Sequence, residues 1–253
     1  MDASTLRDAL IDAHGGRERW RRVAAIEAAL SSGGLAFASK GQGRALEGLR
    51  IRVEPHARRV TLHDFGGEGG RGVWTPARVA LHDAGGTLLE ERADPRAAMG
   101  RPMKRLAWDR LDILYFAGYA LWNYLSFPFL LDEPGVALDA ATCVADDGTP
   151  RLDARFDDRL PTHSREQSFH LDASLALRRH DYTADVIGGW ARAANLALAS
   201  ERVDGLRFYT RRRVLPRLPG LAAPLPGPVL VRIEIDDLRV DWRPADGGVA
   251  HPA

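Results

Sequence analysis

The stretch RIRVEPHARRVTLHDF, residues 50–65, alternates apolar and polar side chains on both sides of a short interruption. Ile51 and Val53 alternate with arginines, and Val60 and Leu62 alternate with polar residues beyond His56. Successive side chains of a β-strand point to opposite faces, so this period of two is typical of half-buried strands. The stretch therefore predicts two antiparallel strands joined by a turn, with one face of each strand in a core.

Similar strand-like segments, separated by glycine-rich turns, fill most of the chain on both sides of this pair. The predicted segments are 24–38, 44–54, 58–65, 71–82, 86–92, 136–145, 150–158, 162–172, 175–184, 199–214 and 228–242. Strands that follow one another without intervening helices favour a meander. We therefore expect a mainly β protein, with about 10–11 strands in a strongly curved antiparallel sheet or open half-barrel.

Helices are expected at two places only. Residues 4–13 form an amphipathic helix that Ser4 can cap and that Gly15-Gly16 ends, and a short second helix runs through Trp20. A helical insert at about 94–131 interrupts the strands. We predict one domain over residues 1–242, a disordered tail over 243–253, and an apolar proline-rich loop at 215–228, whose opening as a lid the sequence leaves undecided.

Composition excludes several classes of protein. Among 253 residues, 35 basic side chains balance 34 acidic ones, which argues against a nucleic-acid-binding protein. The single cysteine excludes an internal disulfide framework. The start of the chain lacks the basic and apolar regions of a signal peptide, which predicts a cytoplasmic protein. The uncharged segment 113–131 contains Asn123, Ser126 and Pro128, so we expect a buried helix and no membrane span.

Common cofactor and catalytic motifs receive no support. Residues 67–72, GEGGRG, satisfy the dinucleotide pattern, but a strand follows where a phosphate-binding helix should begin. The chain has no phosphate-binding loop of the Walker type and neither HExxH nor GxSxG. The histidines lack the close spacing of metal ligands. We predict neither a cofactor nor a metal.

Candidate catalytic residues come from two neighbouring strands. Alternation places His180 and Tyr182 on one face of their strand and Asp181 on the other, and a hairpin can bring His163 or His170 close to this group. A histidine beside a carboxylate can act as a general acid or base near neutral pH. Cross-strand hydrogen bonding is the alternative, and it is the more common reason for such a pair.

Aromatic side chains crowd the helical insert, and they are the candidate ligand-binding residues: Tyr115, Tyr119, Trp122, Tyr124, Phe127 and Phe129. The first three share one helical face. Such a stripe is explained equally well by core packing and by a wall around an apolar ligand with one polar group. The run Arg211-Arg212-Arg213 is expected to be a solvated cluster, with anion binding by Arg211 or Arg213 as the alternative.

Short motifs spread over residues 5–242 resemble those of the LolA-like superfamily, the lipoprotein-carrier type of half-barrel. They are Ala13-His14-Gly15-Gly16 with Trp20, Val23 and Ile26, then Phe127-Pro128-Phe129, Leu160-Pro161-Thr162-His163-Ser164, Arg179-His180-Asp181-Tyr182 and Val231-Arg232-Ile233-Glu234-Ile235. The resemblance implies an eleven-stranded antiparallel sheet wrapped around helices, with a hydrophobic cavity that takes acyl chains in the carriers. The VioE-type enzymes of violacein biosynthesis have a similar fold and work without a cofactor.

Two functions follow as hypotheses. The first is a soluble carrier or sensor that holds a hydrophobic small molecule in the half-barrel. The second is a cofactor-independent isomerase, cyclase or hydrolase of secondary metabolism that acts on an apolar metabolite. In that enzyme His163 or His180 would move a proton, Asp181 would orient the histidine, and Tyr182 would donate to a developing oxyanion. The sequence does not determine the oligomeric state.

Overall fold

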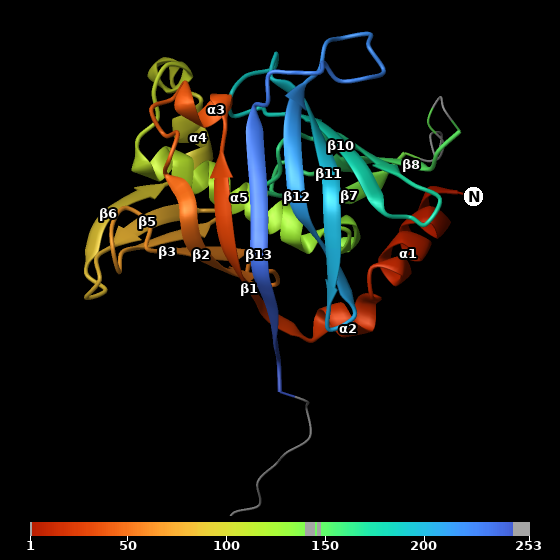
Figure 1. Ribbon diagram of the computed structural model, residues 1–253, viewed down its shortest axis with the longest axis horizontal. Helices are drawn as coiled ribbons and strands as arrows, with labels where there is room; N and C mark the ends of the chain where they lie inside the picture. Colours follow the sequence, from red (N-terminus) through yellow and green to blue (C-terminus); the bar gives the residue numbers. More distant parts are fainter. Residues whose placement is uncertain (1, 140–144, 146–147, 245–253) are drawn as a thin grey trace, which may run out of the picture.

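The computed structural model describes residues 2–139, 145 and 148–244, and in these ranges thirteen strands form one antiparallel sheet (Figure 1). Its strand order is β6-β5-β4-β3-β2-β1-β13-β12-β11-β10-β9-β8-β7, so the two halves of the chain meet where β1 pairs with β13. The sheet is open, because its edge strands β6 and β7 are not paired with each other. The strands are β1 Val23–Gly33, β2 Leu46–Glu54, β3 Arg59–His63, β4 Arg71–Thr75, β5 Arg78–His82, β6 Leu88–Ala93, β7 Val136–Leu138, β8 Arg151–Phe156, β9 Glu166–Leu171, β10 Leu177–Thr183, β11 Arg192–Val203, β12 Leu206–Pro216 and β13 Val231–Trp242.

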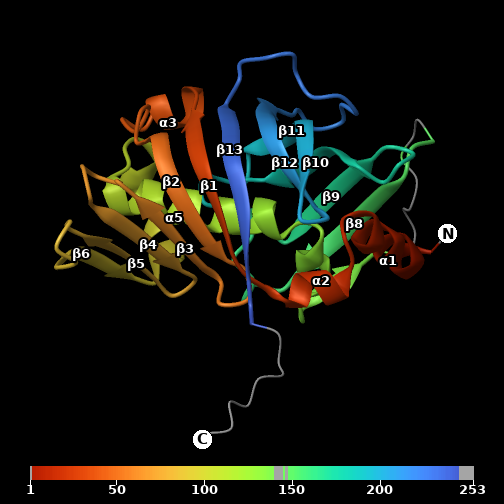
Figure 2. The same ribbon diagram turned by 60° about the horizontal axis from the view of Figure 1, so that its bottom comes forward.

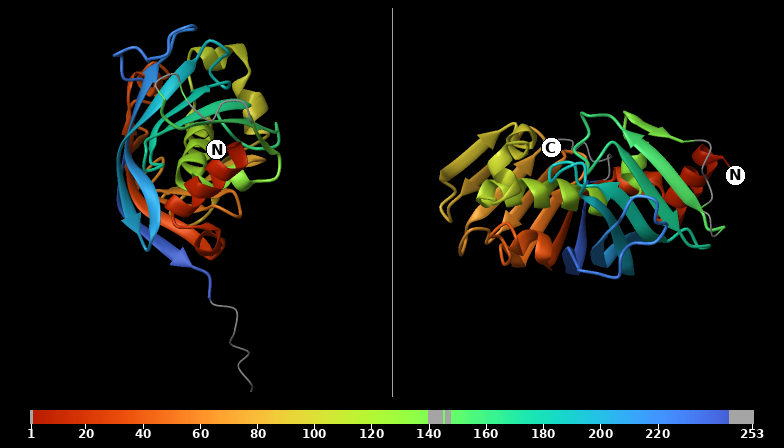
Figure 3. Two further views of the ribbon diagram at one scale, coloured as in Figure 1. Left: turned by 90° about the vertical axis from the view of Figure 1, so that its right-hand side faces the viewer. Right: turned by 90° about the horizontal axis from the view of Figure 1, so that it is seen from above.

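Helix α5, Arg110–Ser126, lies on the concave side of the sheet and is buried along almost its whole length (Figure 3). It begins at a capping box, in which the Asp109 carboxylate accepts the N–H of Asp112 at 2.9 Å and the Asp112 carboxylate accepts the N–H of Asp109 at 2.8 Å. The uncharged sequence that follows is therefore a core helix. This arrangement confirms the predicted mainly β half-barrel around a helical insert.

Close packing holds α5 against the sheet at Gly118. A Cβ atom at this position would lie 2.2 Å from Cγ of Trp74 on β4, a residue that is fully buried. Glycine lowers helix stability by about 1 kcal/mol relative to alanine, but here it lets the indole ring reach the helix backbone. The absence of a side chain at position 118 thus sets the distance between α5 and β4.

The other helices are short: α1 Ala3–Ala13, α2 Arg17–Arg21, α3 Leu35–Ala38, α4 Pro95–Met99, and the 3-10 turns η1 Pro102–Arg105 and η2 Phe129–Asp132. Two sequence predictions need correction. Asp2, and not Ser4, caps α1, because its carboxylate accepts the Thr5 N–H at 2.8 Å. The strand predicted over 24–38 ends at Gly33, since Gly34 has a φ of 132° and the chain turns there into α3.

Helix α1 is held to the sheet by His14, the residue that follows it. His14 Nδ1 lies 2.8 Å from the Leu10 carbonyl oxygen, and Nε2 lies 2.8 Å from the hydroxyl of Tyr209 on β12. That hydroxyl also accepts the N–H of Leu177. The imidazole therefore donates from Nδ1 and accepts from the Tyr209 hydroxyl at Nε2, so all its polar atoms are used structurally.

One end of the half-barrel carries most of the exposed apolar side chains. β1, β10 and β12 end there, β11 and β13 begin there, and α3 and the loop 217–230 lie over it (Figure 2). We call these exposed residues the apolar rim: Leu35, Met103, Leu106, Trp190, Leu218, Leu221 and Val229. Among the described residues, no helix is long and apolar enough to cross a membrane, and the predicted tail lies outside the described residues from position 245.

Candidate functional site

The candidate site is a buried cluster between α5 and strands β9–β12, and it contains three of the four predicted catalytic residues. The imidazole of His163 stacks on the ring of Tyr182, with centroids 3.9 Å apart and an interplanar angle of 8°. The His180 ring lies 6.1 Å from that of His163. Both imidazoles are buried and point into the half-barrel, as alternation along β10 predicts for His180.

Neither ring nitrogen of His163 has a hydrogen-bond partner in the part of the chain that the structure describes. Burial lowers its pKa to about 3, with smaller contributions from the charges of Arg96 and Arg212. Burial also lowers the pKa of His180 well below the usual value. The cluster therefore holds neutral imidazoles at physiological pH. His180 uses Nε2, which lies 2.6 Å from Oε1 of Gln167, whereas the polar atoms of His163 remain unused.

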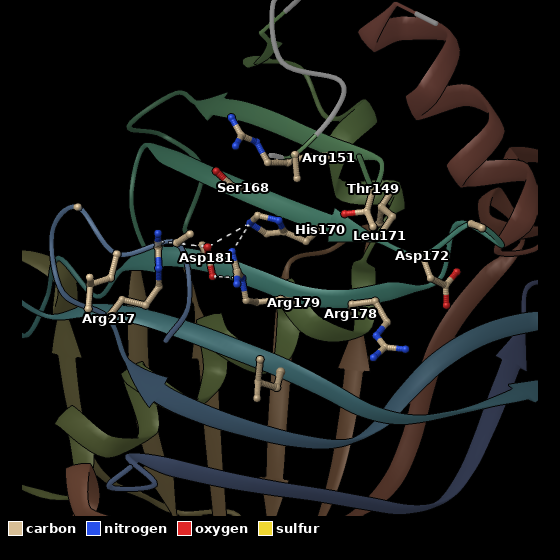
Figure 4. Close-up of a pocket in the computed structure, with 16 residues that line it drawn as sticks. Thr149, Arg151, Ser168, His170, Leu171, Asp172, Arg178, Arg179, Asp181 and Arg217 are labelled. Atoms are coloured by element: carbon tan, nitrogen blue, oxygen red, sulfur yellow. Dashed lines mark hydrogen bonds and ion pairs between the residues drawn. The ribbon is translucent and has the colours of Figure 1, made fainter. Parts of the chain in front are cut away.

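Asp181 lies on the opposite, outer face of the sheet (Figure 4). Its buried carboxylate contacts Nε2 of His170 at 3.1 Å, Nε of Arg179 at 3.0 Å and Nη1 of Arg217 at 3.2 Å. The hairpin thus brings His170 to Asp181 and His163 to Tyr182. Asp181 is separated from the imidazoles that it was predicted to orient, and it instead ties the start of the loop 217–230 to β10.

The outer face around Asp181 is hollowed into an open pocket of about 860 Å³. Its walls carry mostly arginines and polar residues, among them Arg151, Arg178, Ser168 and Thr149. The single negative charge of the buried Asp181 is shared among three partly buried basic side chains, so the pocket contains an ion-pair network. Leu171, Leu196 and Leu221 also line it, so apolar side chains lie beside the charged groups.

Arg212 is the functional candidate that sequence reasoning missed. The run of three arginines was expected to be solvated, but its middle member is 1% exposed and points into the half-barrel. Arg211 and Arg213 point outward, where they pair with Asp236 at 2.6 Å and Glu234 at 3.5 Å. Alternation along β12 was the available signal, because Arg212 must face away from its two neighbours and share a face with the buried Val214.

The Arg212 guanidinium has no carboxylate partner among the described residues, and its Nε and Nη1 atoms have no hydrogen-bond partner. It lies over two aromatic rings, with Cζ 4.6 Å from the centroid of Tyr124 and 5.4 Å from that of Tyr209. Burial lowers the pKa of Arg212, and the neighbouring tyrosines oppose this shift. A buried cation without a counter-charge is costly, so this group is an exception to the usual pairing of charges.

Other buried polar atoms near the cluster also lack a hydrogen-bond partner within the described ranges. They are the side-chain amide atoms of Asn195, the Tyr119 hydroxyl and Oδ1 of Asn123. Most buried polar groups in proteins are hydrogen-bonded, so each exception asks for an explanation. Their concentration around Arg212 and His163 indicates either internal water or the polar part of a ligand.

An apolar crevice runs from this cluster between α5 and strands β1, β12 and β13. Its volume is about 30 Å³, room for only one or two water molecules, and its lining includes Leu30, Phe37, Ala120, Val214 and Ile233. A second space of about 10 Å³ lies beside Arg212, Asn123 and His180. The open hydrophobic cavity that the family resemblance implies is therefore closed in this structure, because α5 fills the half-barrel.

Tyr124 lies between these two spaces and lines both of them. Its hydroxyl is 3.1 Å from that of Tyr182, which also lines the crevice. Burial raises the pKa of both phenols, so both are neutral hydroxyls that can donate or accept. The tyrosine pair separates the apolar crevice from the space at Arg212.

The remaining predicted ligand-binding aromatics spread over different parts of the core. Tyr119 reaches the cluster, with its ring 5.0 Å from that of His163, while Tyr115 contacts Arg96. The Trp122 Nε1–H donates to the Pro55 carbonyl at 2.9 Å. Phe127 stacks on Phe169 at 5.1 Å, and Phe129 stacks on Trp20 at 4.4 Å. Of the six, Tyr124 alone lines the apolar crevice.

The cluster has the chemistry of a binding site for a polar group inside an apolar core. Its described members include one fully buried cation, neutral imidazoles and several hydroxyl or amide groups, but no carboxylate. Among the described residues, no group of three or more His, Cys, Asp or Glu side chains is placed to hold a metal ion.

Comparison with known proteins gives a match at the level of the fold. No family model and no curated protein matches the chain. The crystal structure of a LolA superfamily protein from Nitrosomonas europaea is similar over 95% of this chain and 94% of that chain, with a TM-score of 0.52 and 9% identity. A DUF1329 family protein from Desulfovibrio piger matches over 95% of this chain and 93% of that chain, with a TM-score of 0.46 and 12% identity. The chain therefore has a LolA-like fold, as its short motifs indicated.

Proposed function

We propose that this protein binds a hydrophobic small molecule between α5 and strands β1, β12 and β13, as a carrier or sensor. The observation that carries the proposal is the apolar crevice, which ends at a group of buried polar atoms without partners. Ligand sites in proteins typically combine an apolar wall with a few polar groups that fix orientation. The LolA-like fold is consistent with this function.

The apolar rim supports the same location. Leu35 on α3 is 50% exposed, and Leu218 and Val229 in the loop 217–230 are 49% and 39% exposed. The rim lies at the end of the sheet where β1, β12 and β13 approach α3, and the α3 residue Phe37 lines the crevice. An apolar molecule leaving water would meet these side chains first.

Binding requires the crevice to widen, since about 30 Å³ is far below the size of a ligand site. The loop 217–230 is the part of the rim best placed to move. Apart from its contacts with β12 and β13, the loop is held at both ends. At its start Arg217 forms an ion pair with Asp181 and donates its N–H to the Arg192 carbonyl at 3.0 Å. At its end the loop contacts α3. We infer that the loop moves outward and the side chains lining α5 readjust when the ligand enters.

A cofactor-independent enzyme acting on an apolar metabolite is the second candidate, because His163, His180 and Tyr182 do lie together in the cluster. Two features favour binding over this chemistry. With a pKa of about 3, His163 is a weak base at neutral pH. Asp181, the predicted orienting carboxylate, lies on the other face. The catalytic roles of these four residues therefore remain a prediction, and turnover of an apolar metabolite that is lost in His163→Gln would support them.

The binding proposal is tested with N-phenyl-1-naphthylamine, an uncharged apolar probe whose fluorescence rises in a dry environment. The lipid-extracted full chain is titrated with the probe, alongside Ala120→Val and Ala199→Val. Ala120 lines the crevice and its added methyl groups fill the space, whereas Ala199 is exposed on β11. Thermal melting confirms that each variant is folded.

The expected result is saturable binding that weakens by at least about tenfold in Ala120→Val, the equivalent of about 1.4 kcal/mol, and is unchanged in Ala199→Val. Equal binding by both variants would show that the probe binds outside the crevice. The absence of saturable binding by the wild type would refute the proposal.

A further inference from the structure

We propose that the ligand of this half-barrel carries a single carboxylate group, which Arg212 binds beside the Tyr124–Tyr182 pair. The inference rests on the proposed function and adds the chemical class of the ligand: a long-chain carboxylic acid. It follows from a buried cation that no carboxylate of the described residues neutralises and from the space next to that cation.

The guanidinium group is placed as a binding group for an anion. It is 1% exposed, and no described residue forms a hydrogen bond with its Nε and Nη1 atoms. Each of these nitrogens has an N–H group that can donate a charge-assisted hydrogen bond to a carboxylate oxygen. The π-faces of Tyr124 and Tyr209 lie against the guanidinium at 4.6 Å and 5.4 Å and hold its position without neutralising its charge.

The surrounding groups fit a carboxylate better than an uncharged head. Asn195 is fully buried beside the Tyr124 hydroxyl, and the Tyr124 and Tyr182 hydroxyls can each turn a proton toward an anion. No carboxylate pairs with Arg212 among the described residues, so a negative head group would meet no pre-existing counter-ion.

The charge balance favours a monoanion over a phosphate. Among the described residues of the cluster Arg212 is the one fully buried cation, since burial keeps His163 and His180 neutral. The nearby Arg96 is only half-buried and donates to the Thr162 carbonyl oxygen at 2.9 Å. One carboxylate would neutralise the charge of Arg212, whereas a dianionic phosphate would bury a charge that nothing compensates. The space beside Arg212 is also small, at about 10 Å³ before any adjustment.

The position of the tyrosine pair gives the orientation of the ligand. Tyr124 and Tyr182 line the apolar crevice, and Tyr124 also lines the space that contains Arg212. A chain lying along Leu30, Val214 and Ile233 would therefore end at the phenol hydroxyls, with its head directed to the guanidinium. The alkyl chain of the ligand leaves water, and its carboxylate gains a buried cation as partner. The head group therefore determines which ligands bind.

The test compares laurate with dodecanol, which have the same chain length and differ in charge. Each displaces N-phenyl-1-naphthylamine from the lipid-extracted full chain at neutral pH. The variants are Arg212→Met, with Arg212→Gln as a second neutral replacement, and Arg213→Met as the matched control. Arg213 is the next residue on the same strand, but its side chain points outward and pairs with Glu234.

We expect the wild type and Arg213→Met to bind laurate at least about tenfold more tightly than dodecanol, because a buried charge-assisted hydrogen bond has that strength or more. In Arg212→Met and Arg212→Gln this preference should disappear, while dodecanol binds as before. Equal binding of laurate and dodecanol by the wild type, or a preference that survives in a folded Arg212 variant, would overturn the inference and leave the proposed function standing. Failure of the naphthylamine and both chains to bind would refute both.

Discussion

The Arg212 guanidinium lies with its Cζ atom 4.6 Å above the ring of Tyr124, fully inside the half-barrel and without a carboxylate partner among the described residues. Tyr124 connects this cation to the rest of the site, because its hydroxyl reaches Tyr182 and its ring lines the apolar crevice. Tyr124 therefore lies between the polar space at Arg212 and the apolar crevice. This arrangement is the feature on which the predictions about binding depend.

The first prediction concerns the stability of the ligand-free protein. Arg212→Met removes a buried charge that has no counter-ion and keeps most of the apolar side-chain volume. We expect the free energy of unfolding to rise by about 1–3 kcal/mol, because relief of desolvation exceeds the lost cation–π contact of about 2 kcal/mol. Urea unfolding measures the change, and Arg213→Met should alter it by less than about 0.5 kcal/mol. A destabilised Arg212→Met would assign the arginine a structural role.

The second prediction is that stability falls on mild acidification. His14 and His163 are buried and have pKa values lowered to about 4 and about 3. The unfolded chain takes up protons at these histidines below about pH 6.5, whereas the folded chain does not until the lower values, so stability is lost as the pH falls through this window. At pH 5 the free energy of unfolding should be lower than at neutral pH by about 2 kcal/mol for each of these two histidines.

Variants separate this effect from general acid denaturation. His163→Phe keeps an aromatic ring against Tyr182 and removes the titrating group. Between pH 7 and pH 5 the variant should therefore lose about 2 kcal/mol less unfolding free energy than the wild type does. The control is His82→Gln on β5, where the histidine is only half-buried. Identical pH profiles for the wild type and His163→Phe would contradict the assignment of a neutral buried imidazole.

The third prediction tests the packing of α5 on the sheet. Gly118→Ala places a Cβ atom 2.2 Å from Cγ of the buried Trp74, and neither backbone nor indole has room to move. Overpacking should destabilise the protein by about 3 kcal/mol despite the better helix propensity of alanine. Gly189→Ala, at a position with open space around it, should be nearly neutral in the same unfolding experiment. A stabilised Gly118→Ala would mean that α5 does not sit against β4.

The fourth prediction concerns Asp181 on the outer face. Asp181→Asn removes the charge shared by His170, Arg179 and Arg217 and leaves these basic groups together. We expect a loss of about 1–3 kcal/mol in unfolding free energy, since the partners are partly solvated. Because Arg217 begins the loop 217–230, protease cleavage in this loop should also become faster. Unchanged cleavage would show that Asp181 does not hold the loop.

Period-two patterns predicted the sheet well, because half-buried strands such as β2 and β3 keep apolar residues on one face. The uncharged run in α5 predicted a buried helix, because side chains without charge along a whole helix favour the core. Short elements were harder: α3 follows β1 directly, and only the left-handed backbone of Gly34 separates them. Caps also depend on one side-chain rotamer, which explains why Asp2 rather than Ser4 begins α1.

The candidate site was predictable in part. The sequence singled out His163, His180 and Tyr182, and alternation already put Asp181 on the opposite face. The pairing of His170 with Asp181 depends on the register between β9 and β10, which residue types do not determine. Three consecutive arginines are typical of a solvated cluster, which is why Arg212 was not predicted as a site residue, whereas alternation along β12 buries the middle one. The closed crevice follows from side-chain packing, which no pattern encodes.

The central claim is that an apolar ligand lies between α5 and the sheet, and intermolecular nuclear Overhauser effects test it most directly. With methyl-labelled Ile, Leu and Val in the full chain and laurate as ligand, the account predicts contacts from the alkyl chain to Leu30, Val214 and Ile233, which line the crevice. Contacts confined to Leu196 and Leu221, which line the outer pocket, would contradict it.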